Sequence, residues 1–301
     1  MARHKATMIV DLNEYIGKHQ LQGLGIGHDN KIYILSTEED FSRREGNFAL
    51  VKSREAHDYT VTIINEKLEI SQVVIPNQRF IYTRVQPLHD NELLLVSARA
   101  KFRSRHDFDR NAKVFSYDGY LLREFTLGEG ITTSNYHIWI GHFDQGVYWN
   151  YEWQDAGATD VPSDVNGLFE WDHDGNNLWG YPVQSGTSNI WDVYGLTVDD
   201  DDVVWAYYYS YTNRLVAVKD GTILKHWRVP FASSQIAVWK EHTAFLTGST
   251  IDLWLCEPDR PMRKVSKHKL RPTPHFLSTR GHRIIYYTDD KIYELSISDL
   301  L

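Results

Sequence analysis

Residues 194–229 read YGLTVDDDDVVWAYYYSYTNRLVAVKDGTILKHWRV, and this stretch decides the fold of the chain. It holds four hydrophobic runs of strand length, rich in Val, Tyr and Trp, which polar segments separate. The last turn is Asp220-Gly221, and Asp-Gly between alternating hydrophobic runs is the strongest short-range signal for a β-hairpin. The stretch therefore predicts one four-stranded antiparallel sheet.

The same turn signals recur along the chain. The turn between the first two runs has copies about 40 to 60 residues apart, marked by Asp29, Asp90, Asp144, Asp200, Lys240 and Arg280. Repeated units of short strands, with almost no helical periodicity, predict an all-β fold, a six-bladed β-propeller with four-stranded antiparallel blades. Five or seven blades would require a unit to be split or merged, which the spacing does not favour.

The two ends of the chain support a closed ring. The last unit stops after its third strand, residues 291–295, whereas an extra strand over residues 7–12 precedes the first unit. A blade that lacks its outer strand would leave an exposed sheet edge. We therefore expect the N-terminal strand to complete the last blade, in a single domain over residues 1–301.

Three long segments separate the second and third predicted strands of the first three units, at residues 36–57, 98–111 and 150–166. In a four-stranded meander these loops share an end with the connections between blades, so we expect them on one face. Loops on a rigid scaffold often carry function, although drift of tolerant surface loops is the alternative.

Composition narrows the partners and the location. Hydrophobic residues make up 42%, enough for a normal core, and the formal charge of −8 disfavours nucleic acid or an anionic membrane. A cationic cluster between Arg99 and Arg110 is either a solvated loop or an anion site. The single Cys256 excludes an intrachain disulfide, and no run approaches the roughly 18 apolar residues of a membrane span. We predict a cytoplasmic protein, monomeric by default.

A recurring pattern places a Gly before an aliphatic residue, then an Asp-containing turn, then an apolar strand with Trp or Tyr. It stands at residues 195–199 with 203–205, and at residues 25–29 with 32–34. In this pattern the chain resembles a broad six-bladed group that includes NHL-repeat proteins, gluconolactonase-like hydrolases and, more distantly, the seven-bladed streptogramin B lyase. The pattern covers most of the chain and specifies the fold, which does not itself give a function.

The resemblance also implies two kinds of site. The gluconolactonase-like group implies an axial divalent cation held by a Glu, two Asn and an Asp, for which Asn135, Asn189 and Asp192 are the candidates. Residues 19–22 read His-Gln-Leu-Gln where that group implies the Glu, so we expect no cofactor, with calcium or magnesium in the axial funnel as the alternative. The lyase implies an axial His and Glu set, for which His137 and His275 offer the histidines.

The connections between blades should line the axial funnel with polar and aromatic side chains, a surface suited to small ligands. The funnel candidates are Arg79, Asn135, His137, Asn189, Trp191, Asp192 and His275. The rim candidates are Arg103, Arg105, Trp153 and Tyr211. Many such residues serve only to close turns or pack strands.

Three functions remain open on these observations. The first is a non-enzymatic propeller that binds a protein or a small polar ligand on the face with the three insertions and in the funnel. The second is a metal-dependent hydrolase or lyase with its site in the axial funnel. The third is a carbohydrate-binding propeller that uses the rim aromatics.

Overall fold

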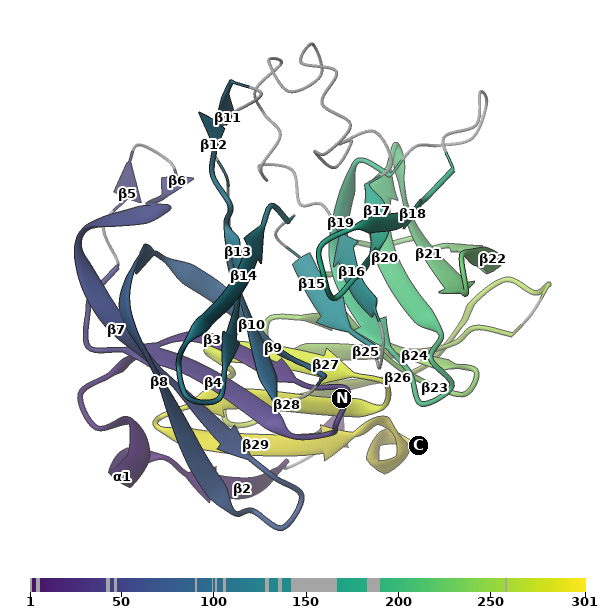
Figure 1. Ribbon diagram of the computed structural model, residues 1–301. Coiled ribbons are helices and arrows are strands. Elements are labelled where there is room, and N and C mark those ends of the chain that lie inside the picture. Colours follow the sequence, from purple (N-terminus) through teal and green to yellow (C-terminus); the bar gives the residue numbers. More distant parts are fainter. Residues whose placement is uncertain are drawn as a thin grey trace. The chain divides into compact units, whose positions relative to one another are not determined.

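The protein has the six four-stranded antiparallel sheets of a six-bladed β-propeller, and the fifth sheet carries one additional short parallel strand at its edge (Figure 1). The computed structural model describes residues 2–3, 6–41, 44–45, 48–89, 91–98, 100, 102–104, 107–127, 130–134, 137–141, 167–182, 190–257 and 259–301. These residues form two compact units: residues 14–164 with 170–178, and residues 1–13 with 165–169 and 179–301. The fold predicted from the recurring turns is confirmed.

The first two sheets lie in the unit of residues 14–164. The first contains β3 (Gln20–Ile26), β4 (Ile32–Thr37), β7 (Lys52–Ile64) and β8 (Ile70–Phe80), and the short helix α1 (Asn13–Ile16) precedes it. The second contains β9 (Tyr82–Leu88), β10 (Glu92–Ser97), β13 (Ala112–Ser116) and β14 (Leu121–Phe125). Two ribbons extend their loops, β5 (Arg44–Glu45) with β6 (Phe48–Ala49) and β11 (Phe102–Ser104) with β12 (Asp107–Phe108).

The third sheet contains β15 (Gly130–Thr133), β16 (His137–Gly141), β17 (Leu168–Asp172) and β18 (Asn177–Gly180). The fourth contains β19 (Asp192–Val198), β20 (Val204–Ser210), β21 (Thr212–Lys219) and β22 (Thr222–Arg228). The fifth contains β23 (Gln235–Trp239), β24 (His242–Thr247), β25 (Thr250–Leu255) and β26 (Arg263–Lys269). The sixth contains β27 (Phe276–Arg280), β28 (Arg283–Thr288) and β29 (Lys291–Ser296), followed by the 3-10 helix η1 (Ile297–Leu300).

The N-terminal strand completes the sixth sheet, as the sequence predicted. Strand β2 (Thr7–Asp11) pairs antiparallel with β29, with Met8 opposite Tyr293. The buried Leu12 follows it and donates its backbone N–H to the carbonyl of Asp290 at 2.7 Å. A second N-terminal strand, β1 (Ala2–Arg3), adds a parallel edge to β26 of the fifth sheet, which the sequence did not indicate.

Each sheet has two distinct ends. The turns between its first and second strands and between its third and fourth strands lie at one end, which we call the hairpin end. The loop between its second and third strands lies at the other end, with the connections to neighbouring sheets. We call this the connection end, and the insertions of the first two sheets lie there.

The third sheet corrects one sequence interpretation. The sequence predicts that Asp144 marks its first hairpin and that His137 lies on a connection between blades. Instead β15 pairs with β16, and the Ser134 N–H donates to the His137 carbonyl at 2.9 Å, so these residues form the hairpin. Asp144 and the segment 150–166 lie outside the described residues.

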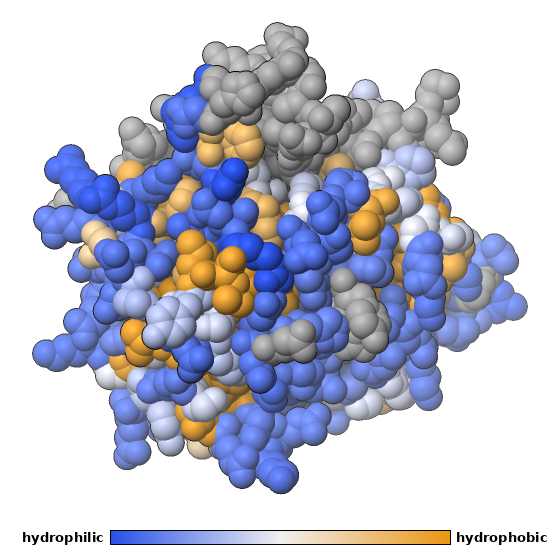
Figure 2. Space-filling model, viewed as in Figure 1, coloured by the Kyte–Doolittle hydropathy of each residue, from blue (hydrophilic) through white to orange (hydrophobic). Residues whose placement is uncertain are grey.

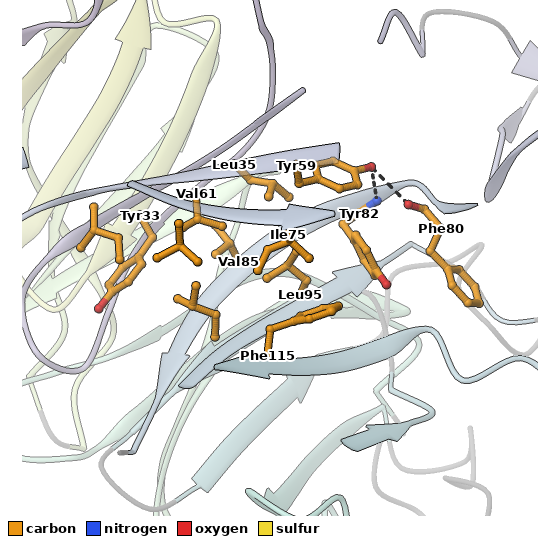
Figure 3. Packing of buried hydrophobic residues seen from close by; sticks show 13 residues of the cluster. Tyr33, Leu35, Tyr59, Val61, Ile75, Phe80, Tyr82, Val85, Leu95 and Phe115 are labelled. Atoms are coloured by element: carbon orange, nitrogen blue, oxygen red, sulfur yellow. Dashed lines mark hydrogen bonds between the residues drawn. The ribbon is translucent and has the colours of Figure 1, made fainter. Parts of the chain in front are cut away.

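Buried hydroxyl groups fix the backbone at the connection end. The Tyr59 hydroxyl donates to the Phe80 carbonyl at 3.2 Å and accepts from the Tyr82 N–H at 2.9 Å (Figure 3). The Tyr207 hydroxyl does the same between the fourth and fifth sheets, with Phe231 and Ser233 at 3.0 Å each. Because buried backbone groups need partners, these tyrosines hold the connections in one conformation.

The space-filling view shows mostly polar residues with small apolar patches between them (Figure 2). No helix among the described residues has the length and apolar character to cross a membrane. Cys256 is buried, and burial raises the pKa of its thiol to about 11, which suits a packing role.

Candidate functional site

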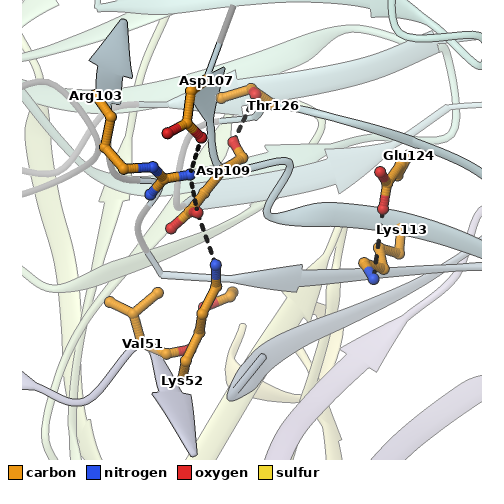
Figure 4. Close-up of polar contacts among 9 residues, drawn as sticks. Val51, Lys52, Arg103, Asp107, Asp109, Lys113, Glu124 and Thr126 are labelled. Atoms are coloured by element: carbon orange, nitrogen blue, oxygen red, sulfur yellow. Dashed lines mark hydrogen bonds and ion pairs between the residues drawn. The ribbon is translucent and has the colours of Figure 1, made fainter. Parts of the chain in front are cut away.

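The insertions of the first two sheets meet at the connection end. Lys52 is the first residue of β7 and lies within the first insertion, and its Nζ donates to Oδ1 of Asp109 in the second insertion at 2.7 Å (Figure 4). The Asp109 side chain is only 5% exposed, and Arg103 Nη2 donates to the same oxygen at 3.0 Å. One buried carboxylate therefore ties two loops that lie far apart in the sequence.

A hollow of about 290 Å³ opens beside this ion pair. We call it the insertion hollow, and it is lined by Lys52, Phe80, Asp107, Phe108, Asp109, Arg110 and Glu124. The buried Phe80 gives it an aromatic wall, over which Lys52 Nζ lies 4.4 Å from the ring centroid. Its volume is near the lower limit for small-ligand pockets, about 300 Å³.

Charged groups of both signs surround the insertion hollow. Arg110 Nη1 lies 3.5 Å from Glu124 Oε1, and these side chains are 55% and 34% exposed. Lys113 Nζ lies 3.4 Å from the other Glu124 oxygen. Hydrogen bonds to Asp107 and then Asp109 hold the pKa of Arg103 above its ordinary value. Carboxylates of the same loop thus balance part of the cationic cluster between Arg99 and Arg110.

A second group of side chains lies at the connection end of the fourth sheet. Trp191 precedes β19, Tyr211 joins β20 to β21, and their ring centroids are 4.2 Å apart. The two residues are 46% and 73% exposed. The buried Asp192 follows Trp191, and its Oδ2 accepts a hydrogen bond from the Tyr194 hydroxyl at 3.4 Å.

A histidine and a glutamate form a pair in the third sheet. His137 Nδ1 in β16 lies 2.8 Å from Glu170 Oε1 in β17, and these side chains are 35% and 7% exposed. A buried carboxylate orients the imidazole, whose exposed part can exchange protons with a bound molecule. Because β16 begins at the first hairpin, His137 lies at the hairpin end and not at the predicted blade connection.

Three histidines from three hairpin turns also pack against one another with tilted rings. His89 lies between His28 and His173, with ring centroids 5.4 Å and 5.2 Å away. Arg123 braces this cluster, because its Nε donates to the His173 carbonyl at 2.8 Å and both terminal nitrogens bind Glu92. Burial, and then the neighbouring His89, His28 and Arg123, lower the pKa of His173 to about 4.

The structure brings some of the candidates together and separates others. Trp191 and Tyr211 come together and Asp192 follows Trp191 in the chain, whereas Arg103 belongs to the ion pairs beside the insertion hollow. Arg79 near the end of β8 and His275 before β27 are both exposed. Asn135, Asn189, Arg105 and Trp153 lie outside the described residues.

In the described part of the chain, no group of three or more His, Cys, Asp or Glu side chains is placed so that it could hold a metal ion. Asp192 is the one described member of the three metal candidates. Sequence reasoning missed Lys52, Asp109 and Glu170, whose roles depend on partners in other strands or loops. No local motif marks any of the three.

Neither a family model nor a curated protein sequence matches the chain. Two solved structures of virginiamycin B lyase from Staphylococcus aureus resemble it, one of a catalytically inactive variant with quinupristin and one of the selenomethionine-substituted protein. They share 12% and 13% identity, with TM-scores of 0.47 and 0.48. The alignments cover 95% and 96% of this chain and 97% and 98% of the lyase chains.

Proposed function

We propose that this protein is a binding propeller that holds a small ligand with both an anionic and a cationic group in the insertion hollow. The observation that carries the proposal is the Lys52–Asp109 pair, which joins the first two insertions around a charged cavity. A rigid scaffold that fixes two loops in this way provides a preorganised site.

The charges of the insertion hollow favour a ligand with both signs. Lys52 is committed to Asp109, whereas Arg110 and Glu124 form a partly exposed pair of the kind worth about 0–1 kcal/mol. A ligand can replace that weak pair, its carboxylate binding Arg110 and its ammonium binding Glu124. Phe80 offers an apolar contact to the rest of the ligand.

We favour binding over catalysis at this site, because the carboxylates and cations of the lining are paired with one another. Among the described residues around the insertion hollow there is no serine, cysteine or histidine that could act as nucleophile or proton carrier near neutral pH. Its volume of about 290 Å³ suits an amino acid or a dipeptide. Localisation in the cytoplasm and action as a monomer remain part of this proposal.

A thermal-shift panel tests the proposal. The probes are the common amino acids and a set of dipeptides, with succinate and putrescine as single-sign comparisons. We expect at least one zwitterion to raise the melting temperature of the wild type, because a ligand that binds the native state stabilises it. Arg110→Ala should lose this response.

The matched control is Lys67→Ala, which removes an exposed cation from the hairpin end of the first sheet. It should respond like the wild type. The proposal fails if no zwitterion stabilises the wild type, or if Arg110→Ala keeps the full response.

The His137–Glu170 pair favours hydrolase or lyase chemistry as a second candidate function. Glu170 would orient the imidazole, and His137 would take and return a proton at the bound substrate. The test is turnover of aryl esters and lactones, with and without calcium or magnesium, by the wild type, His137→Asn and Glu170→Gln. Turnover that both substitutions reduce supports this candidate, and no turnover, or turnover that survives them, removes it.

A further inference from the structure

Trp191 and Tyr211 form an exposed aromatic pair, and contacts within the fourth sheet hold the Trp191 ring in position. The ring planes of Trp191 and Tyr211 meet at 59°. The Tyr209 ring also contacts the Trp191 ring, with centroids 5.7 Å apart and planes at 70°. The Trp191 N–H also donates to the Tyr209 carbonyl at 3.0 Å. The indole is therefore held by both its backbone and its ring contacts.

Tyr211 has a backbone conformation that is unfavourable for tyrosine. It is the single residue between β20 and β21, where Ser210 pairs with Thr212, and its φ is +55°. Bulky residues rarely adopt this left-handed region, which glycine accepts without strain. A strained aromatic that exposes 73% of its surface contributes little to the core, and such outliers concentrate at functional sites.

A carboxylate accompanies the aromatic pair. Asp192 follows Trp191 directly in the chain, its residue is only 8% exposed, and its Oδ2 accepts from the Tyr194 hydroxyl. An exposed aromatic pair whose next residue in the chain carries a hydrogen-bonded carboxylate suits the two-sided chemistry of a sugar ring. The C–H bonds on one face of a pyranose are apolar, whereas the hydroxyl groups at its edge donate hydrogen bonds.

We propose that Trp191 and Tyr211 form a stacking platform for a pyranose ring, with Asp192 as the acceptor for a sugar hydroxyl. A protein partner fits less well, because interfaces of that kind bury roughly 800 Å² on each side and need a larger apolar centre than two rings. This site is separate from the insertion hollow and extends the proposed function to a second class of ligand.

A glycan array tests the platform, followed by titration of the best binder among its mono- and oligosaccharides. We expect the wild type to bind at least one glycan, and Trp191→Ala to weaken that binding by about tenfold or more. Tyr211→Gly should weaken it similarly while its melting temperature stays equal or rises, because glycine relieves the left-handed strain.

The matched control is Tyr120→Gly, which removes an equally exposed tyrosine, 72%, from the turn between β13 and β14 of the second sheet. It should leave glycan affinity unchanged. A silent array overturns the platform, as does binding that survives both Trp191→Ala and Tyr211→Gly. The zwitterion panel reads the insertion hollow separately, so the two proposals can fail independently.

Discussion

The side chain of Asn111 holds the backbone of Leu127 by two hydrogen bonds. Its Oδ1 accepts from the Leu127 N–H at 3.0 Å, and its Nδ2 donates to the Leu127 carbonyl at 2.9 Å. The same Nδ2 donates to the Ser97 carbonyl at 2.7 Å. One fully buried side-chain amide thus holds together the two ends of the second insertion and the chain segment that follows β14.

Asn111→Leu should destabilise the protein by about 2 kcal/mol or more. The substitution leaves buried backbone N–H and C=O groups without a hydrogen-bond partner, and each such group costs about 1–3 kcal/mol. Urea denaturation measures the effect. Asn213→Leu is the control, since Asn213 is less buried and its Nδ2 donates to the Phe231 carbonyl at 2.7 Å. Equal losses in the two variants would contradict the special role of Asn111.

Leu12→Ala should cost about 2–5 kcal/mol, the usual range for truncation of a buried leucine. Met8→Ala in the same N-terminal segment should cost little, because Met8 is 49% exposed. Denaturation of both variants compares them directly. A small effect of Leu12→Ala would show that this segment does not complete the sixth sheet.

Gly25→Ala should destabilise the protein more than Gly195→Ala. A Cβ at Gly25 would lie 2.6 Å from the Val85 carbonyl oxygen, whereas a Cβ at Gly195 would lie 3.0 Å from the Ile236 nitrogen. Overpacking of this kind costs about 1–3 kcal/mol, and the closer backbone contact should give the larger loss. Thermal denaturation provides the order, and the reverse order would refute the packing described for these strands.

Acid should lower the stability of the native state through the cluster of His28, His89 and His173. The pKa of His173 is lowered from 6.5 to about 4 in the native protein, so the unfolded chain binds more protons between those values. The contribution of His173 is therefore complete above pH 6.5 and decreases as the pH falls toward 4. His28, His89 and Arg123 oppose its protonation, whereas Glu92 favours it.

The free energy of unfolding, measured from pH 7 to pH 4, should fall less steeply in His173→Gln than in the wild type. Parallel curves for His173→Gln and the wild type would contradict the lowered pKa.

Turn chemistry explains why most of the fold was predictable. Asp199 Oδ1 accepts from the N–H groups of Asp201 and Val203, and Gly221 adopts a φ of +67°, so these turns require the residues that mark them. The third sheet was misread because its first hairpin at Ser134 lacks such a marker, whereas Asp144-Gln145-Gly146 resembles one.

The sites were less predictable than the fold. Trp191, Asp192 and Tyr211 were candidates because the strand pattern placed them at the connection end. Asp109 could not be recognised as a site residue, because its role depends on its ion pair with Lys52. The sequence does not show how the two loops bring these residues together. Glu170 stands in an ordinary alternating strand pattern, so the sequence does not single it out. It meets His137 because β16 and β17 lie side by side in the third sheet.

The most direct test of the proposed function is amide hydrogen exchange of the whole chain with and without each zwitterion of the panel. Binding in the insertion hollow predicts slower exchange at residues 107–110, around Lys52 and around Glu124, with the hairpin ends unchanged. Unaltered exchange at those residues with every compound, or protection confined to other parts of the chain, would contradict the account.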